Sequence, residues 1–352
     1  MRSKLFIILS VLLLIVIGGY FGANYYVQRQ AKVNIDNFIK ENHLENEVKY
    51  ADVRSSLFSK SIRVDNITYY INDPVKKQKI GRITAKYAVV KGDLKNSTSV
   101  KLYGMSFINL NNKLPKELSD KVMFTVQNAY YKANKQGNIE TYESSADNIK
   151  INTDMISFQN ELKKKKYEEF SKVVLMNNPI DVYSHYTYDK SKQELKIDNS
   201  SMNFKNNFNF SYSALIDGID IPSVNKHLQA MKKNNNMMEM IAVTGELMSM
   251  KIKHMRFVFV NNGIVERLLN LSASTKNESK DIIINKMLKN SENLYNGELH
   301  SSLKNLLLSK SKKFTFNIVS KNGATMGQLM FSSHKQPMGE IVDKQFNLSF
   351  SN

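Results

Sequence analysis

The sequence contains no cysteine. A disulfide framework is therefore excluded, as are thiol catalysis and every metal site that needs a cysteine ligand. An exported protein of this composition must be held together by its apolar core alone. Hydrophobic residues make up 42% of the 352 residues, which is enough for one large or two ordinary domains and excludes global disorder.

Arginine is also scarce, since only 7 of the 50 basic residues are arginine and the other 43 are lysine. Arginine is the side chain that makes bidentate contacts with phosphates and bases. The formal charge of +18 therefore does not indicate nucleic-acid binding, and a lysine-rich and asparagine-rich background explains it better. We predict no nucleic-acid partner, and we expect the charge to attract anionic surfaces such as lipid headgroups.

The motifs of common enzymes are missing as well. There is no Gly-x-x-x-x-Gly-Lys-Ser/Thr loop, no Gly-x-Gly-x-x-Gly and no Gly-x-Ser-x-Gly elbow. The histidines are scattered without metal-ligand spacing, at His43, His185, His227, His254, His300 and His334. The carboxylates nearest to predicted strand ends, Asp181, Asp217 and Asp220, are expected to serve turns. These absences predict a protein that is not an enzyme and needs no cofactor.

One long apolar run is present, from Leu5 to Ala23, and it holds 19 residues without a charge. As a helix this run covers about 28 Å, close to the hydrocarbon thickness of a bilayer. A cleaved signal peptide is the alternative, but bulky Phe21 would then stand at −3, where cleavage prefers a small residue. We predict an uncleaved single span. Long polar domains cross largely regardless of charge, so residues 24–352 are expected on the far side of the membrane.

The chain after the span is predicted to have three parts. Residues 24–44 read as an amphipathic stem helix, residues 45–220 as an antiparallel β-rich region, and residues 221–352 as a mixed α+β region continuous with the same sheet. No linker rich in Pro, Gly or Ser divides residues 45–352. The alternation of Ile62 and Val64 shifts at Asp65-Asn66, which predicts a β-bulge.

Helices interrupt the strand runs. We expect helices at 156–176, from 222 to about 243, at 264–274, at 278–294 and at 298–309, and closing strands at 313–320, 325–333 and 345–351. The methionine-rich run MKKNNNMMEMIAVTGELMSM is interpreted as helix core, with an adaptable apolar groove as the alternative. The predicted fold class is α+β, predominantly antiparallel β: a long curled, taco-like sheet with several helices, preceded by one transmembrane helix.

Two strands place aromatic side chains at alternate positions. Phe208, Phe210 and Tyr212 share one face of the first strand, and the second strand carries Met255, Phe257 and Phe259 on one side. We predict that these residues line an apolar groove for a ligand.

Several segments resemble a known family. The pattern Val48-x-Tyr50-x-x-Val53, then Ser56-Leu57-Phe58-Ser59-x-Ser61-Ile62 and Val64-x-Asn66-Ile67, after a single span and a stem helix, is similar to the opening of the YdgA-like and AsmA-like envelope proteins of bacteria. The run from Phe257 to Arg267, FVFVNNGIVER, also resembles a segment of such proteins. The resemblance implies a curled antiparallel sheet in the periplasm, tethered to the inner membrane. AsmA-like members are associated with moving or managing lipids through an apolar trough in the sheet.

These observations support two hypotheses and leave a third open. In the first, the chain is a non-enzymatic protein of the inner membrane that binds lipids or supports envelope lipid homeostasis, with its C-terminal domain in the periplasm. In the second, it is a scaffold or assembly factor whose partner is another envelope protein. The third, a hydrolase of envelope polymers, would require a clustered carboxylate or Ser/His group that no local motif indicates.

Overall fold

The computed structural model describes residues 24–41, 44–56, 60–72, 78–93, 97–110, 121–152, 173, 178–234, 237–289, 297–321, 323–328 and 345–352. The predicted membrane span at 5–23 lies outside these ranges, and so does nearly all of the helix predicted at 156–176. Among the described residues, no helix combines the length and the hydropathy that a membrane crossing requires.

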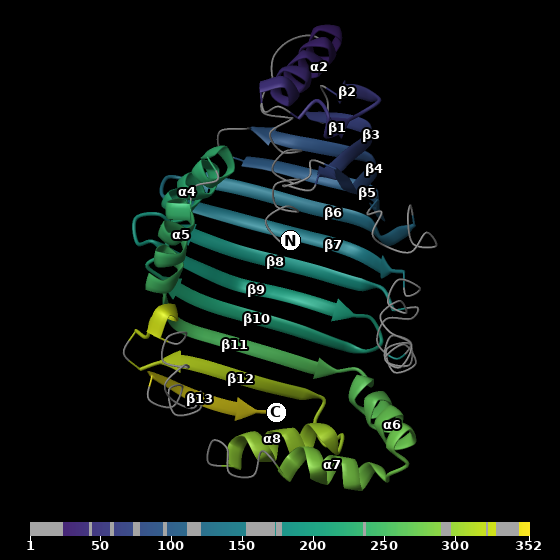
Figure 1. The fold of residues 1–352 in the computed structure, drawn as a ribbon, viewed down its shortest axis with the longest axis vertical. Coiled ribbons are helices and arrows are strands. Elements are labelled where there is room, and N and C mark those ends of the chain that lie inside the picture. The colour runs from purple at the N-terminus through teal and green to yellow at the C-terminus, as the bar shows by residue number, and fades with distance from the viewer. Residues whose placement is uncertain are drawn as a thin grey trace. The chain divides into compact units, whose positions relative to one another are not determined.

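Among the described residues, one helix precedes a long series of strands, and the remaining helices lie before and after strand β11 (Lys251–Asn261) (Figure 1). The strands are β1 (Val48–Lys49), β2 (Asp52–Ser56), β3 (Ser61–Asn72), β4 (Lys79–Asp93), β5 (Ser97–Asn109), β6 (Val122–Gln136), β7 (Ile139–Ile151), β8 (Ile180–Asp189), β9 (Glu194–Phe204), β10 (Phe208–Asp217), β11 (Lys251–Asn261), β12 (Lys313–Ser320) and β13 (Phe346–Ser351). The helices are α2 (Asn24–Glu41), α4 (Ile221–Asn234), α5 (Met237–Ser249), α6 (Ile264–Lys276), α7 (Lys280–Lys289) and α8 (Glu298–Leu307).

The chain divides into two compact units. Unit 1 comprises Met1–Lys135 and Tyr142–Tyr183, and unit 2 comprises Gln136–Thr141 and Ser184–Asn352. In unit 1 the strands are hydrogen-bonded in the order β1-β3-β4-β5-β6, with β2 also paired to β3, and in unit 2 the order is β9-β10-β11-β12-β13. Every pairing in these two series is antiparallel. The predicted antiparallel β-rich fold with several helices is confirmed.

Helix α2 packs on the sheet of unit 1 through one apolar stripe. Ala31, Ile35 and Ile39 recur every four residues and are 1%, 1% and 7% exposed, which is the spacing that puts side chains on one side of a helix. The strands supply the rest of this core, which contains Val48, Val53, Ile62, Val64, Ile67, Ile83, Ala85, Ala88, Val90, Val100, Leu102, Met105, Val126 and Ala129. The stripe therefore fixes α2 to the sheet.

The buried positions of unit 1 change parity midway along the strands. In β3, Val64 is buried before Asn66 and Ile67 is buried after it, so the alternation skips one residue. Asn66 has a left-handed φ of 52°, and Gly104 in β5 has a φ of 60°. A left-handed residue changes which side of the strand the next side chains occupy, so one face stays apolar on both sides of it. The predicted β-bulge at Asp65-Asn66 was wrong, because the pairing of β3 with β4 keeps its register across Asn66. The shift in alternation comes from the left-handed conformation of Asn66 instead.

The start of α6 is locked to the turn between β9 and β10. Asn261 accepts the backbone N–H groups of Gly263 (3.0 Å) and Val265 (3.2 Å), two of the donors that a helix N-terminus leaves unpaired. Gly263 has a φ of 105°, which a glycine adopts without strain. The Arg267 guanidinium donates to the carbonyl of Asn206 (2.6 Å) and to the side chain of Asn207, which is fully buried. This explains why FVFVNNGIVER reads as a strand, a turn and a helix.

Helices α6, α7 and α8 form a separate apolar cluster in unit 2, and α8 lies beside β13 (Figure 1).

Two predictions for other segments of unit 2 were wrong. The helix predicted from 222 to about 243 is two helices, α4 and α5, the second of which continues to Ser249. The strand predicted at 325–333 is a single bridge between Thr325 and Lys251 followed by a helical turn at 326–328, and residues 329–333 lie outside the described ranges.

Candidate apolar binding face

The six predicted groove residues lie on one face of the sheet in unit 2. In the pairing of β10 with β11, Phe210 is opposite Phe259, Tyr212 is opposite Phe257, and Phe208 is two positions along on the same face. Residues directly opposite in an antiparallel pair project from the same side of the sheet. Met255 joins this set opposite Ala214. Residues from two strands separated by two helices therefore meet on one surface.

The face extends beyond the six residues. In register, Phe259 is opposite Phe314 and Phe257 is opposite Phe316 of β12, and Phe316 is in turn opposite Phe350 of β13. Strand β9 adds two more side chains at matching positions, Met202 and Phe204. We call the whole set the aromatic face, and it comprises Met202, Phe204, Phe208, Phe210, Tyr212, Met255, Phe257, Phe259, Phe314, Phe316 and Phe350.

The rings of the aromatic face form a ladder across the five strands. Ring centroids lie 4.3 Å apart for Phe204 and Phe208, 5.5 Å for Phe208 and Phe259, 6.0 Å for Phe257 and Phe316, and 4.9 Å for Phe316 and Phe350. Pairs at these distances stabilise one another by about 0.5–1.5 kcal/mol beyond area burial. The rings therefore pack against one another across the strands and form one apolar surface.

The aromatic face is only partly covered by protein. Phe210 is 36% exposed and Met202 is 40% exposed, and the other members are intermediate in exposure. At one end, Met255 packs with a small cluster whose buried members are Ile252, Ala324 and Phe346. A contiguous apolar surface that keeps some exposure is a candidate site for an apolar partner, whereas one exposed ring alone would be ordinary.

Sequence reasoning missed the contribution of β12 and β13. Phe314 and Phe316 occupy alternate positions, as do Phe346, Leu348 and Phe350. The sequence therefore already indicated that each strand has an apolar side. Their place beside β11 depends on a pairing that spans more than fifty residues from Asn261 to Lys313, and no local pattern determines such a pairing.

The carboxylates suspected from the sequence have structural partners. Asp217 accepts a hydrogen bond from Lys253 at 2.7 Å, which is the main reason that the pKa of this lysine is raised. Asp220 accepts the backbone N–H of Ser223 at 3.0 Å at the start of α4, and Asp181 accepts that of Asn148 at 2.8 Å. Asp220 thus has the kind of turn role predicted for it, whereas Asp217 and Asp181 contact residues of other strands, which the prediction did not include.

A polar cluster between α4 and α5 was not predicted. His227 Nδ1 lies 2.5 Å from Glu239 Oε2, and His227 Nε2 lies 4.0 Å from Glu246 Oε1. The Ser223 hydroxyl donates to Glu246. The serine proton is thus directed at a carboxylate and not at the histidine, unlike the Ser–His pair of nucleophilic hydrolases. The spacing of four residues between Ser223 and His227 on one helix was the available signal.

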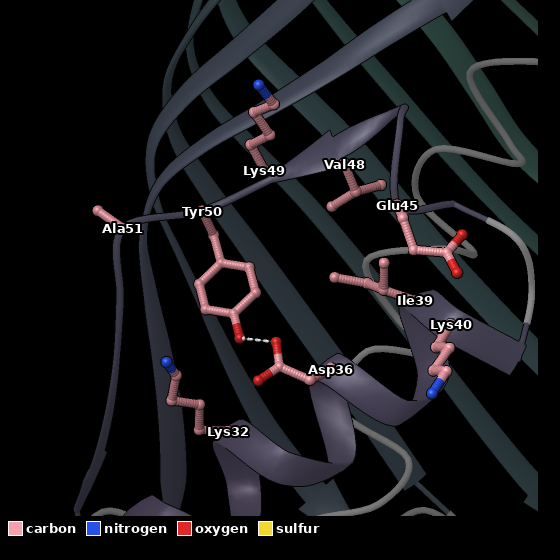
Figure 2. A pocket seen from close by; sticks show the side chains of 9 residues that line it. All are labelled: Lys32, Asp36, Ile39, Lys40, Glu45, Val48, Lys49, Tyr50 and Ala51. Atoms are coloured by element: carbon pink, nitrogen blue, oxygen red, sulfur yellow. Dashed lines mark hydrogen bonds between the residues drawn. The ribbon is translucent and has the colours of Figure 1, made fainter.

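Unit 1 has an open surface pocket between α2 and the chain that follows it (Figure 2). Its lining combines lysines, carboxylates and apolar side chains, namely Lys32, Asp36, Ile39, Lys40, Glu45, Val48, Lys49, Tyr50 and Ala51. The Tyr50 hydroxyl donates to Asp36 at 2.5 Å across the pocket. Burial and this carboxylate raise the pKa of Tyr50. Because side chains of both charge signs line the pocket, its charge indicates no particular class of ligand.

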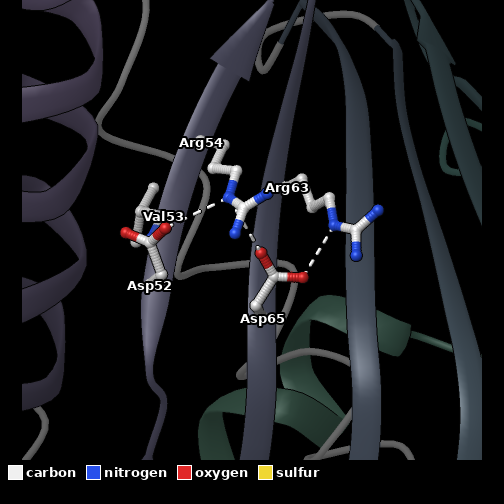
Figure 3. Close-up of polar contacts among 5 residues, drawn as sticks. All are labelled: Asp52, Val53, Arg54, Arg63 and Asp65. Carbon is white, nitrogen blue, oxygen red and sulfur yellow. Dashed lines mark hydrogen bonds and ion pairs between the residues drawn. The ribbon is translucent and has the colours of Figure 1, made fainter.

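A charged cluster lies on β2 and β3 (Figure 3). Asp65 is 7% exposed and contacts Arg54 at 3.4 Å and Arg63 at 2.7 Å. The guanidinium of Arg63 lies 3.8 Å from the centroid of the Tyr87 ring, a cation–π distance. Both cations are paired within the protein, so this cluster serves the sheet.

The chain is thus an antiparallel β-sheet protein with a helical hairpin and a partly exposed aromatic face. Residues 201–351 match a family model described only as "Uncharacterized protein". That segment contains the whole aromatic face and helices α4 to α8, and it is less than half of the 352 residues. No curated protein matches the chain.

Proposed function

We propose that the chain is a non-enzymatic envelope protein that binds lipid acyl chains on the aromatic face. In this proposal residues 5–23 anchor it as a single span in the inner membrane, with its C-terminal domain in the periplasm. Its role is to support envelope lipid homeostasis, as the resemblance to YdgA-like and AsmA-like proteins implies.

The observation that carries the proposal is the aromatic face itself. It offers rings on neighbouring strands, and Phe210 and Met202 retain 36% and 40% exposure. An acyl chain has no polar group to satisfy, so a surface of rings and thioethers with few polar atoms suits it. Small-molecule sites also need convergent polar groups. In the pairing, Ser200 is opposite Tyr212, and Asn261 is opposite Phe208 but already binds the start of α6.

Backbone irregularities in the sheets support the proposed curl. The register shifts between Tyr212 and Ala214 where β10 meets β9, and between Leu215 and Ile216 where β10 meets β11. An irregular ladder of this kind bends the strand and increases its local twist. Curling toward the aromatic face would convert it from a surface into a trough.

Native mass spectrometry of the detergent-extracted full chain tests the proposal. We expect phospholipid to be retained, and Phe257→Asp to abolish retention, because Phe257 contacts Phe210, Tyr212 and Phe316. The matched control is Val319→Asp. Val319 is 42% exposed on β12, and its neighbour Ile318 belongs to the side of the aromatic face, so Val319 projects from the opposite side.

The two outcomes separate the hypotheses. Lipid retained by the wild type and by Val319→Asp, and lost from Phe257→Asp, supports the lipid function. A wild-type protein that is consistently free of lipid contradicts it and favours the alternative, a periplasmic scaffold or assembly factor that acts through a protein partner.

A further inference from the structure

Helix α5 presents apolar side chains to its surroundings. Met240, Ile241 and Leu247 are 51%, 56% and 40% exposed. At 100° per residue, Met240 and Leu247 lie almost in line, and Ile241 lies about 100–120° around the helix from them. The three therefore bound one exposed side of α5, about a third of its circumference. We call these three residues the α5 patch. A helix that faces water normally exposes its charged side and buries its apolar side.

The charged side of α5 is turned inward instead. Glu239 and Glu246 are directed at α4, where His227 lies 2.5 Å and 4.0 Å from their carboxylate oxygens and Ser223 donates to Glu246. Their side chains are 26% and 28% exposed. Both carboxylates of the hairpin are therefore engaged in a contact between α4 and α5, and neither lies on the side of α5 that carries the α5 patch.

The polar group in the middle of the patch is satisfied within the helix. Thr244 lies one turn after Met240, and its hydroxyl donates to the Met240 carbonyl at 2.8 Å. Gly245 follows it, and no atom lies within 4 Å of the place where a Cβ would stand. A hydroxyl bonded to its own helix costs little when water is removed from around it. The exposed side of α5 is thus suited to an environment without water.

We propose that the α5 patch docks on the surface of a bilayer that carries anionic headgroups. Residues 221–251 contain four lysines, Lys226, Lys232, Lys233 and Lys251, and only the two inward-turned glutamates. Apolar insertion combined with attraction between lysines and anionic lipid is the usual basis of interfacial helix binding. Methionine adapts its shape to an irregular surface, as lipid contact requires.

This inference rests on the proposed membrane location and adds a second contact to it, independent of the aromatic face. A partner protein is the competing occupant. The charge balance favours the membrane, because the hairpin carries an excess of lysine and the whole chain has a formal charge of +18.

Site-directed fluorescence tests the proposal on the full chain. Because the sequence has no cysteine, one cysteine can be introduced by Met240→Cys and labelled with an environment-sensitive dye. The control is Lys304→Cys, at an exposed position of α8 in the same unit. Both proteins are reconstituted into phosphatidylethanolamine and phosphatidylglycerol vesicles, with and without spin-labelled lipid as a quencher. Resistance to carbonate extraction reports the anchor separately.

We expect a blue shift and strong quenching of the dye at position 240, and neither at position 304. Adding Ile241→Glu should reduce quenching to the level of the control, and replacing phosphatidylglycerol with phosphatidylcholine should lower it. Equal quenching at 240 and 304 in a carbonate-resistant protein overturns the docking of α5 and leaves the anchor intact. Loss of carbonate resistance overturns the anchor instead, so the two failures are distinguishable.

Discussion

His227 Nδ1 lies 2.5 Å from Glu239 Oε2, and this contact joins α4 to α5 across the hairpin. The two side chains are 27% and 26% exposed, so water only partly screens the pair. Glu239 is directed at α4 in this contact, while Met240 and Ile241 of the same helix are exposed. The polar seam of the hairpin and its apolar exterior are therefore parts of one arrangement.

Breaking this contact should loosen α5. We expect His227→Ala and Glu239→Ala each to weaken the hairpin by about 1 kcal/mol, the usual contribution of a partly buried charged hydrogen bond. Faster amide hydrogen exchange in α5 measures the effect. The double variant should cost less than the sum of the single variants. Strict additivity would show that the two side chains do not interact.

The free energy of unfolding should depend on pH through the titration of Tyr69 in unit 1. Burial, followed by the charge of Glu47 and a hydrogen bond to it, raises the pKa of Tyr69 from 10.0 to about 12. The raised pKa means that the folded state favours the neutral phenol. Its contribution to stability is fully present below pH 10 and is lost as the pH rises from 10 toward 12.

Urea unfolding of the wild type and of Tyr69→Phe between about pH 9 and pH 12 measures this contribution. We expect the free energy of unfolding to fall less steeply for Tyr69→Phe, which cannot titrate there. Glu47→Gln removes the charge and leaves the burial, so it should give an intermediate slope. Identical slopes for all three proteins would be incompatible with a raised Tyr69 pKa.

The charge of Asp65 should matter to the sheet of unit 1. Asp65→Asn leaves Arg54 and Arg63 without their shared carboxylate, and we expect a loss of about 1–2 kcal/mol in the free energy of unfolding. The matched control is Asp52→Asn, because the Asp52 side chain contacts the same Arg54 at 3.1 Å but is 49% exposed. We expect little change from the control, since exposed ion pairs contribute little. If Asp52→Asn lowered the free energy of unfolding as much as Asp65→Asn, burial of the carboxylate would not explain the effect.

Two glycines with the same backbone conformation should respond differently to alanine. Gly104 has a φ of 60° and a Cβ there would lie 2.7 Å from Lys86 Cδ, whereas Gly137 has a φ of 59° and nothing within 4 Å of its Cβ position. Gly137→Ala should cost about 1 kcal/mol from the left-handed conformation alone. Gly104→Ala should cost distinctly more, because Lys86 must also move. Thermal unfolding followed by circular dichroism compares them, and equal losses would mean that Lys86 adjusts freely.

Part of the candidate site could be predicted from the sequence. The alternation at Phe208, Phe210 and Tyr212 already placed three side chains on one side of a strand, and FVFVNNG identified a second strand with its turn. The alignment of Phe210 with Phe259 could not be predicted, because register between strands separated by two helices is a long-range property. The His227 contact was missed for another reason: α4 and α5 were predicted as one helix, in which His227 and Glu239 would lie far apart.

The sequence by itself determined which segments alternate in hydrophobicity, the absence of any cysteine framework, and the apolar run at 5–23, because each of these is a property of neighbouring residues. Only the tertiary structure decided that β11, β12 and β13 pair to build one aromatic face. It also decided that Glu239 and Glu246 point inward while Met240 and Ile241 point outward. Strand pairing and helix orientation depend on contacts between residues that are far apart in the sequence. Their free energy therefore cannot be assigned to any one local segment.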